Sequence, residues 1–158
     1  AQLLSKPGKA RKICNSLSKK IKENFKKIDL ILSPAIGGIV IGYEIGRLLG
    51  IETKFAERKD KNFELGIGFE LKKGQKILII EDVITTGGSV REVMNLVDDA
   101  GGNILGIGVL VDRSNGTVTL HNNQYSIVKL DAVSYGEDEV PDELDKIPIQ
   151  KPGSRHLI

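Results

Sequence analysis

The run from Lys76 to Val90, KILIIEDVITTGGSV, constrains the fold of this 158-residue chain more than any other stretch. Five residues rich in Ile and Leu lead into two adjacent carboxylates, Glu81 and Asp82, and then into a turn of threonines and glycines. A short apolar run bounded by turn residues is typical of a buried strand, and the sequence that follows has the spacing of a helix. We therefore expect a strand, a polar turn and a helix, which together make half of a parallel β-α-β unit.

The rest of the chain repeats this order of elements. Apolar residues recur every four positions from about 8 to 26, with lysines between them, which predicts an amphipathic helix. Further helices are expected at 35–50 and 89–102, and strands at 28–34, 53–58, 76–80, 103–113 and 125–133. Alternating strands and helices predict an α/β fold with a mainly parallel, doubly wound sheet. We expect residues 1–158 to form one domain with an irregular tail.

One segment departs from this order. Residues 63–75 alternate Leu65, Ile67 and Phe69 with polar residues or glycine, and this period of two favours a hairpin-like excursion. A charged stretch, 57–63, comes just before it. We expect this excursion to be a mobile lid.

Three strand ends carry polar residues that can form a site. They are 33–38, the two carboxylates with the loop that follows them, and Asp112-Arg113. In parallel sheets ligands bind beyond the carboxyl ends of the strands, so these three ends are expected to converge at one edge.

The loop from Thr85 to Ser89 is suited to an anion. Its glycines let backbone N–H groups approach a phosphate, its hydroxyls add donors, and the following helix adds partial positive charge at its N-terminus. Two carboxylates would repel a phosphate, but they accept hydrogen bonds from vicinal hydroxyls. The order of acids, threonines and glycines therefore predicts a site for a ribose 5-phosphate.

Composition and motifs argue against several other classes of protein. The 23 basic and 21 acidic residues nearly balance, although 1–27 is strongly basic and 131–146 strongly acidic, and we interpret both stretches as solvated faces. No GxxxxGK[ST] motif of a P-loop nucleotidase occurs, and the GIG triplets lack the third glycine of a dinucleotide fingerprint. The single cysteine, Cys14, and the lack of a long apolar run favour a cytoplasmic protein with no membrane segment.

The run ILIIEDVITTGGS resembles the phosphoribosyl pyrophosphate signature of the type I phosphoribosyltransferases. Three further stretches resemble the orotate phosphoribosyltransferases of that family: SPAIGGIVIGYEIGRLLG, FAERKDKNFELGIGFELKKGQ and VLVDRSNG, together with the terminal IPIQKPGSR. The resemblance implies transfer of ribose 5-phosphate from phosphoribosyl pyrophosphate to orotate, which gives orotidine 5′-monophosphate and pyrophosphate. It also implies Mg²⁺ carried by the substrate with no direct protein ligand, and a homodimer with shared active sites that binds neither nucleic acid nor membrane.

The same resemblance assigns residues to roles. Catalytic roles fall to Lys59 and Asp82, with Arg58 and Lys61 as further candidates, and Lys59 would reach the pyrophosphate of the neighbouring subunit. Orotate contacts are implied for Thr85 and Arg113. The residues implied to hold phosphoribosyl pyrophosphate are Lys59, Glu81, Asp82, Val83, Ile84, Thr85, Thr86, Gly87, Gly88 and Ser89, and those of the pyrophosphate loop are Ala35, Ile36, Gly37 and Gly38.

The chain also departs from the family. Gly37 and Phe63 stand where some members carry a lysine and a histidine, so pyrophosphate contacts from those side chains are not expected. The family has an upstream segment that helps to cover orotate, and we expect it to be missing before Ala1. Two alternatives stay open: a type I enzyme for uracil or a purine base, and a regulatory relative that senses phosphoribosyl pyrophosphate and binds nucleic acid.

Overall fold

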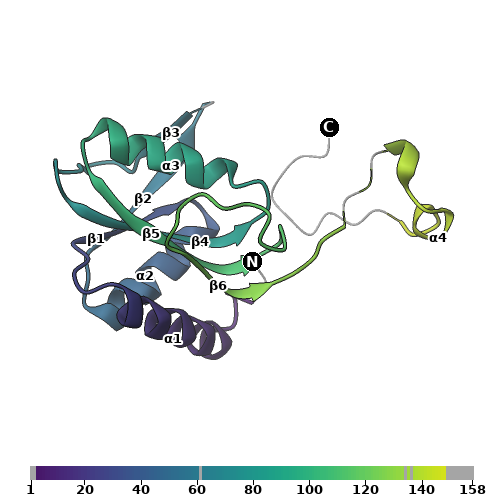
Figure 1. Ribbon diagram of the computed structural model, residues 1–158, viewed down its shortest axis with the longest axis horizontal. Coiled ribbons are helices and arrows are strands. Elements are labelled where there is room, and N and C mark those ends of the chain that lie inside the picture. Colours follow the sequence, from purple (N-terminus) through teal and green to yellow (C-terminus); the bar gives the residue numbers. More distant parts are fainter. Residues whose placement is uncertain (1–2, 61, 134, 136, 149–158) are drawn as a thin grey trace.

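The computed structural model describes residues 3–60, 62–133, 135 and 137–148 of the chain (Figure 1). The elements in chain order are α1 (Pro7–Asn24), β1 (Leu30–Pro34), α2 (Gly37–Leu49), β2 (Thr53–Lys59), β3 (Asn62–Leu65), β4 (Lys76–Ile84), α3 (Gly88–Asp99), β5 (Asn103–Asp112), β6 (Gln124–Lys129), η1 (Glu137–Glu139) and α4 (Asp142–Asp145). The expected α/β class is confirmed.

The described strands form one six-stranded sheet of order β3-β2-β1-β4-β5-β6. Every neighbouring pair is parallel except β2 with β3. Helices α1 and α2 cover one face of the sheet and α3 covers the other (Figure 1). The carboxyl ends of β1, β4 and β5 therefore share one edge, as expected for a parallel sheet.

Two apolar clusters hold these layers together. One joins α3 to the sheet through Val90, Val93 and Val97, and the other joins α1 and α2 to the opposite face. Strand β4 contributes to both, because alternate residues of a strand point to opposite faces. The core of β4 is thus buried on both sides, and the polar end of that strand is built on a fixed support.

Helix α2 lies unusually close to the sheet because of two glycines. A Cβ atom on Gly42 would lie 2.2 Å from Ser33 Oγ, and one on Gly46 would lie 2.1 Å from Thr53 Cγ2. The helix ends at Gly50, whose φ of 69° is the left-handed conformation that glycine adopts without strain, and this is the predicted end. Close packing fixes the start of α2, where the loop 35–38 lies.

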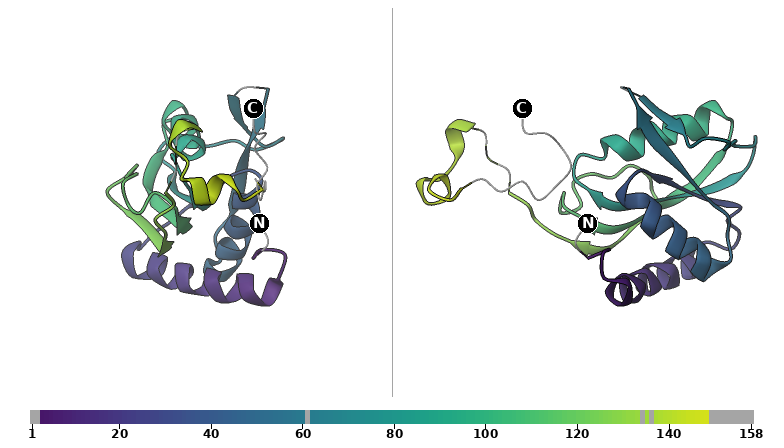
Figure 2. Two further views of the ribbon diagram at one scale, coloured as in Figure 1. Left: turned by 90° about the vertical axis from the view of Figure 1, so that its right-hand side faces the viewer. Right: turned by 180° about the vertical axis from the view of Figure 1, so that it is seen from behind.

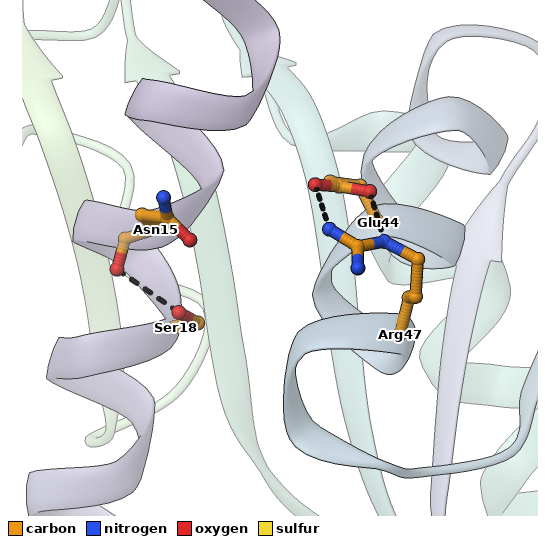
Figure 3. A network of polar contacts seen from close by, with 4 residues as sticks. All are labelled: Asn15, Ser18, Glu44 and Arg47. Atoms are coloured by element: carbon orange, nitrogen blue, oxygen red, sulfur yellow. Dashed lines mark hydrogen bonds and ion pairs between the residues drawn. The ribbon is translucent and has the colours of Figure 1, made fainter.

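The polar contacts that Figure 3 shows on α1 and α2 are local. The Ser18 hydroxyl donates to the carbonyl of Asn15 at 2.9 Å, and Arg47 donates two hydrogen bonds of 2.8 Å to the Glu44 carboxylate. Each contact stays within its own helix. The two helices are joined instead by apolar packing within their shared cluster.

Four sequence-based expectations need correction. The strand expected at 125–133 is β6, which ends at Lys129. Strand β4 continues to Ile84 instead of ending at residue 80, because Glu81 and Val83 stay paired with β5. The alternation after Leu65 forms no strand, since the chain turns at Gly68 (φ 80°) and Phe69 N donates to the carbonyl of Gly66. The tail is not wholly irregular: η1 and α4 form beyond β6, where the chain leaves the body of the molecule (Figures 1 and 2). The terminal IPIQKPGSR lies mostly outside the described residues.

No helix in the described part of the chain is long and apolar enough to cross a membrane.

Candidate active site

The two acids of the signature lie in the last part of β4, in different environments. Glu81 is 6% exposed, whereas Asp82 is only partly buried. Burial raises the pKa of Glu81 to about 9, and a side-chain hydrogen bond with Asp82 adds to the shift. The backbone N–H of Asp82 donates to Glu81 Oε1 at 2.9 Å. Glu81 is therefore a largely protonated, fixed group at neutral pH, and Asp82 is the more accessible carboxylate.

Asp82 lies directly against the loop that precedes α2. A Cβ atom on Gly37 would lie 2.1 Å from Asp82 Oδ2 and 2.5 Å from its Cγ. The ends of β1 and β4 therefore meet through these two residues, as expected for neighbouring parallel strands. Only a residue without a side chain leaves room for the carboxylate here, which gives a structural reason for glycine in place of a lysine.

The loop 35–38 offers backbone groups rather than side chains. The Ala35–Ile36 peptide bond is cis, and Ala35 N donates to the carbonyl of Ala56 on β2. No side chain caps the start of α2, and its first turn contains no acidic residue. The uncapped N–H groups at this helix start are suited to an anion, in keeping with the predicted pyrophosphate loop.

The loop after β4 is fixed by the conformation and the packing of Gly87. Gly87 has a φ of 76°, and a Cβ atom on it would lie 2.9 Å from Leu120 and 3.0 Å from Val118. Both the conformation and the space thus require glycine. Helix α3 begins at Gly88 with no capping side chain and no acid in its first turn. Its first N–H groups stay available to a phosphate.

Arg113 reaches the same place from β5. Ile84 pairs with Asp112 in the sheet, and Arg113 N donates to the carbonyl of Ile84 at 2.8 Å. Asp112 is 1% exposed, and its Oδ1 accepts hydrogen bonds from both the N–H and the hydroxyl of Ser114. This turn fixes the backbone of Arg113 while its side chain stays exposed.

An open cavity of about 440 Å³ joins these two strand ends. It is lined by Thr85, Thr86, Arg113, Ser114, Thr117, Asp131, Ala132 and Val133. Of the predicted site residues, Thr85, Thr86 and Arg113 face this space, whereas the two acids, 87–89 and the loop 35–38 are not part of its lining. Sequence reasoning missed Ser114 and Thr117, although the turn signal SNG was visible, and it missed 131–133, for which the sequence has no signal.

The lid residues lie on the β2–β3 hairpin, toward the β3 edge of the sheet and away from β5. Lys59 has a 72% exposed side chain, with its Nζ 3.8 Å from Glu64 Oε2. Arg58 Nη2 lies 2.5 Å from Glu92 Oε1 on α3. Phe63 is buried under the hairpin, and Lys61 lies outside the described residues.

Burial restricts two further residues, of which only Ile84 is among the predicted site residues. The Ile84 side chain is 1% exposed in the core, so only its backbone can meet a ligand. Cys14 is buried on α1, and burial raises the pKa of its thiol to about 11, which fits a packing role.

Comparison with known proteins places these features in one family. A model described as "Phosphoribosyl transferase domain" matches residues 2–141. The orotate phosphoribosyltransferase of Chlorobium phaeobacteroides (strain DSM 266) is 46% identical over 155 residues, which cover 98% of this chain and 79% of that protein. That of Rhizorhabdus wittichii is 44% identical over 159 residues, which cover 100% and 81%.

Solved structures agree at the level of the fold. Adenine phosphoribosyltransferase from Thermoanaerobacter pseudethanolicus superposes with a TM-score of 0.69 at 19% identity, covering 81% of this chain and 84% of that one. Orotate phosphoribosyltransferase from Aeropyrum pernix gives 0.66 at 17% identity, covering 81% and 75%. The sheet is thus of the type I phosphoribosyltransferase kind. From the sequence relatives and the family model together, the chain belongs to the orotate phosphoribosyltransferase family.

Proposed function

We propose that the protein transfers ribose 5-phosphate from phosphoribosyl pyrophosphate to orotate in pyrimidine biosynthesis. One observation carries this proposal: the loop suited to a phosphate and the strand-end arginine open onto the same cavity. Orotate carries a carboxylate that uracil and the purine bases lack. A guanidinium at that cavity is the donor that such a carboxylate requires.

Each part of the site has a chemical task in this reaction. The bond from the ribose to pyrophosphate breaks while a bond to a ring nitrogen of orotate forms, so positive charge develops on the sugar. The uncapped start of α3 would hold the 5′-phosphate, and Glu81 and Asp82 would hold the ribose hydroxyls. The start of α2 would receive the departing pyrophosphate. Catalysis is then mainly positioning and charge stabilisation.

A magnesium ion bound to the substrate fits this set of donors. No group of three or more His, Cys, Asp or Glu able to hold a metal occurs in the part of the chain that the structure describes. Mg²⁺ prefers oxygen ligands and keeps several waters, so it can be carried by phosphates. When bound it would neutralise pyrophosphate charge. Asp82, partly exposed beside Gly37, would meet its hydration shell.

Lys59, on the lid hairpin, is proposed to act on the active site of a second subunit. It lies at the carboxyl end of β2 on the edge hairpin, with most of its side chain in solvent. Exposed apolar side chains at the start of α2 support a second copy as neighbour: Ile36, just before the helix, and Val40 and Tyr43, on it, are 81%, 48% and 64% exposed. Exposed apolar residues aligned on one helix face are typical of an interface, and two-fold dimers are the commonest symmetric oligomers.

A panel of bases tests the proposed function. The protein is incubated with phosphoribosyl pyrophosphate, Mg²⁺ and orotate, uracil, adenine or hypoxanthine, and turnover is followed by ultraviolet absorbance and by release of pyrophosphate. We expect turnover with orotate alone. Turnover of another base would contradict the assigned substrate. Binding of phosphoribosyl pyrophosphate without turnover of any base would favour the regulatory alternative.

A further inference from the structure

The side chain of Gln124 holds two backbone groups of the loop that precedes it. Gln124 is the first residue of β6, and its Nε2 donates to the carbonyl of Val118 at 2.8 Å. Its Oε1 accepts from the backbone N–H of Leu120 at 3.0 Å. Among the described residues, 118–120 make no backbone–backbone hydrogen bond. One side-chain amide therefore takes the place of a neighbouring strand for this segment.

The same segment is also fastened to the turn after β5. The Ser114 hydroxyl, which donates to the buried Asp112 carboxylate at 2.6 Å, accepts from the N–H of Val118 at 3.1 Å. The carbonyl of Ser114 accepts from the N–H and the hydroxyl of Thr117, at 3.0 and 2.7 Å. Val118 is thus bonded through its N–H to the turn after β5 and through its carbonyl to Gln124 of β6.

Val118 and Leu120 lie against the loop from Thr85 to Ser89 (the phosphate loop). A Cβ atom on Gly87 would lie 2.9 Å from Leu120 Cδ1 and 3.0 Å from Val118 Cγ1. Both side chains are partly buried and pack on the apolar cluster that joins α3 to the sheet. Gly87 comes just before the first residue of α3. A shift of 118–120 therefore changes the space in which the turn into α3 is held.

We propose that Gln124 is a positioning residue for the phosphate loop. Its amide holds Val118 and Leu120 against Gly87, so that the N–H groups at the start of α3 keep the direction needed to hold a phosphate. Gln124 does not line the cavity, so it acts through the segment 118–120 and not by touching substrate. The inference rests on the proposed function, because it takes the phosphate to be that of phosphoribosyl pyrophosphate.

Two variants of Gln124 and a matched control test this role. Gln124→Glu replaces the donor to the Val118 carbonyl by a carboxylate oxygen, and Gln124→Met removes both hydrogen bonds without adding a charge. Asn123→Asp is the control, because the neighbouring amide donates at 3.1 Å to the carbonyl of Leu105, which is on β5 and not in this loop. Both Gln124 variants should raise KM for phosphoribosyl pyrophosphate about tenfold, as expected for loss of one hydrogen bond to a charged group, while kcat changes little. The control should keep the wild-type KM.

The amide signals of Gly87 and Gly88 in a nitrogen–proton correlation spectrum of the ligand-free protein give a readout that does not depend on activity. Both Gln124 variants should shift these signals, and Asn123→Asp should leave them at their wild-type positions. Unshifted signals in a Gln124 variant that folds would overturn the inference, and so would shifted signals with a wild-type KM. A lower kcat at an unchanged KM would also overturn it, because that result indicates loss of folded protein alone. If the wild-type protein acts on no base, the proposed function fails, while the spectra still decide whether Gln124 sets the phosphate loop.

Discussion

Replacing Gly37 by alanine should weaken the binding of phosphoribosyl pyrophosphate while leaving the fold intact. The new Cβ atom would lie 2.1 Å from Asp82 Oδ2, and Cβ atoms essentially never approach another atom within 3.0 Å. The carboxylate, at the end of a short side chain, must therefore withdraw by about 1 Å, which is enough to remove a hydrogen bond from its normal range.

The size of the effect follows from the interaction that would be lost. A hydrogen bond that involves a charged group contributes about 1.5–3 kcal/mol. Loss of the contact between Asp82 and a ribose hydroxyl then weakens binding by about 10- to 150-fold. The melting temperature should change little, because a rotation of the Asp82 side chain relieves the clash without opening the core.

Titration calorimetry with phosphoribosyl pyrophosphate and Mg²⁺ measures this directly. Gly8→Ala is the matched control, because no atom lies within 4 Å of a Cβ atom at that position. In an Asp82→Ala background, where the carboxylate is absent, Gly37→Ala should weaken the binding of phosphoribosyl pyrophosphate little further. Wild-type affinity in Gly37→Ala, or a full additional loss in the Asp82→Ala background, would refute the reasoning.

Three further predictions concern charge. Arg113→Ala should lower kcat/KM for orotate by about tenfold or more, because a charge-assisted contact is lost, and should lower kcat/KM for phosphoribosyl pyrophosphate less. If steady-state kinetics show an equal loss for both substrates, the role of Arg113 is structural. Because burial raises the pKa of Glu81 to about 9, the folded protein keeps a proton that the unfolded chain releases, so the melting temperature of the ligand-free protein should fall from about pH 5 to pH 9. Glu81→Gln should flatten that slope in calorimetry, and an unaltered slope would count against the assignment. Mixing Lys59→Ala with Asp82→Asn chains, each nearly inactive, should restore activity toward a quarter of wild type in a shared-site dimer, and no recovery after verified subunit exchange would exclude sharing.

The sequence was sufficient to predict the elements that local patterns determine. The helix start after the Thr/Gly loop, the glycine end of α2 and the alternation of strands and helices along the chain depend on periodicity and on turn residues, and all were predicted. Strand β4 was predicted too short, because its polar end is extended by pairing with β5 and not by its own composition. Pairing between distant strands has no local signal.

Contacts between distant segments were the part that could not be predicted. The closeness of Gly37 and Asp82 depends on the register of β1 beside β4 and on the close packing of α2. The cavity wall at 131–133 depends on where the chain passes after β6. The contact of Arg58 with Glu92 joins residues 34 apart, and nothing in the charged segment 57–63 indicates it.

The site combines a rigid half and an adjustable half, and the sheet explains the division. The acids and the phosphate loop follow β4, a strand with neighbours on both sides and buried residues toward both layers of helices, so their geometry varies little. The described cations of the lid, Arg58 and Lys59, lie at the end of β2, where this strand is paired only with the edge strand β3. A strand held by one partner opens at lower cost than one held by two. In the proposed reaction, release of pyrophosphate would need such opening, whereas positioning of the ribose would need β4 to stay fixed. The position of the lid cations near the edge of the sheet and of the acids at its centre therefore matches what the steps of the proposed transfer require.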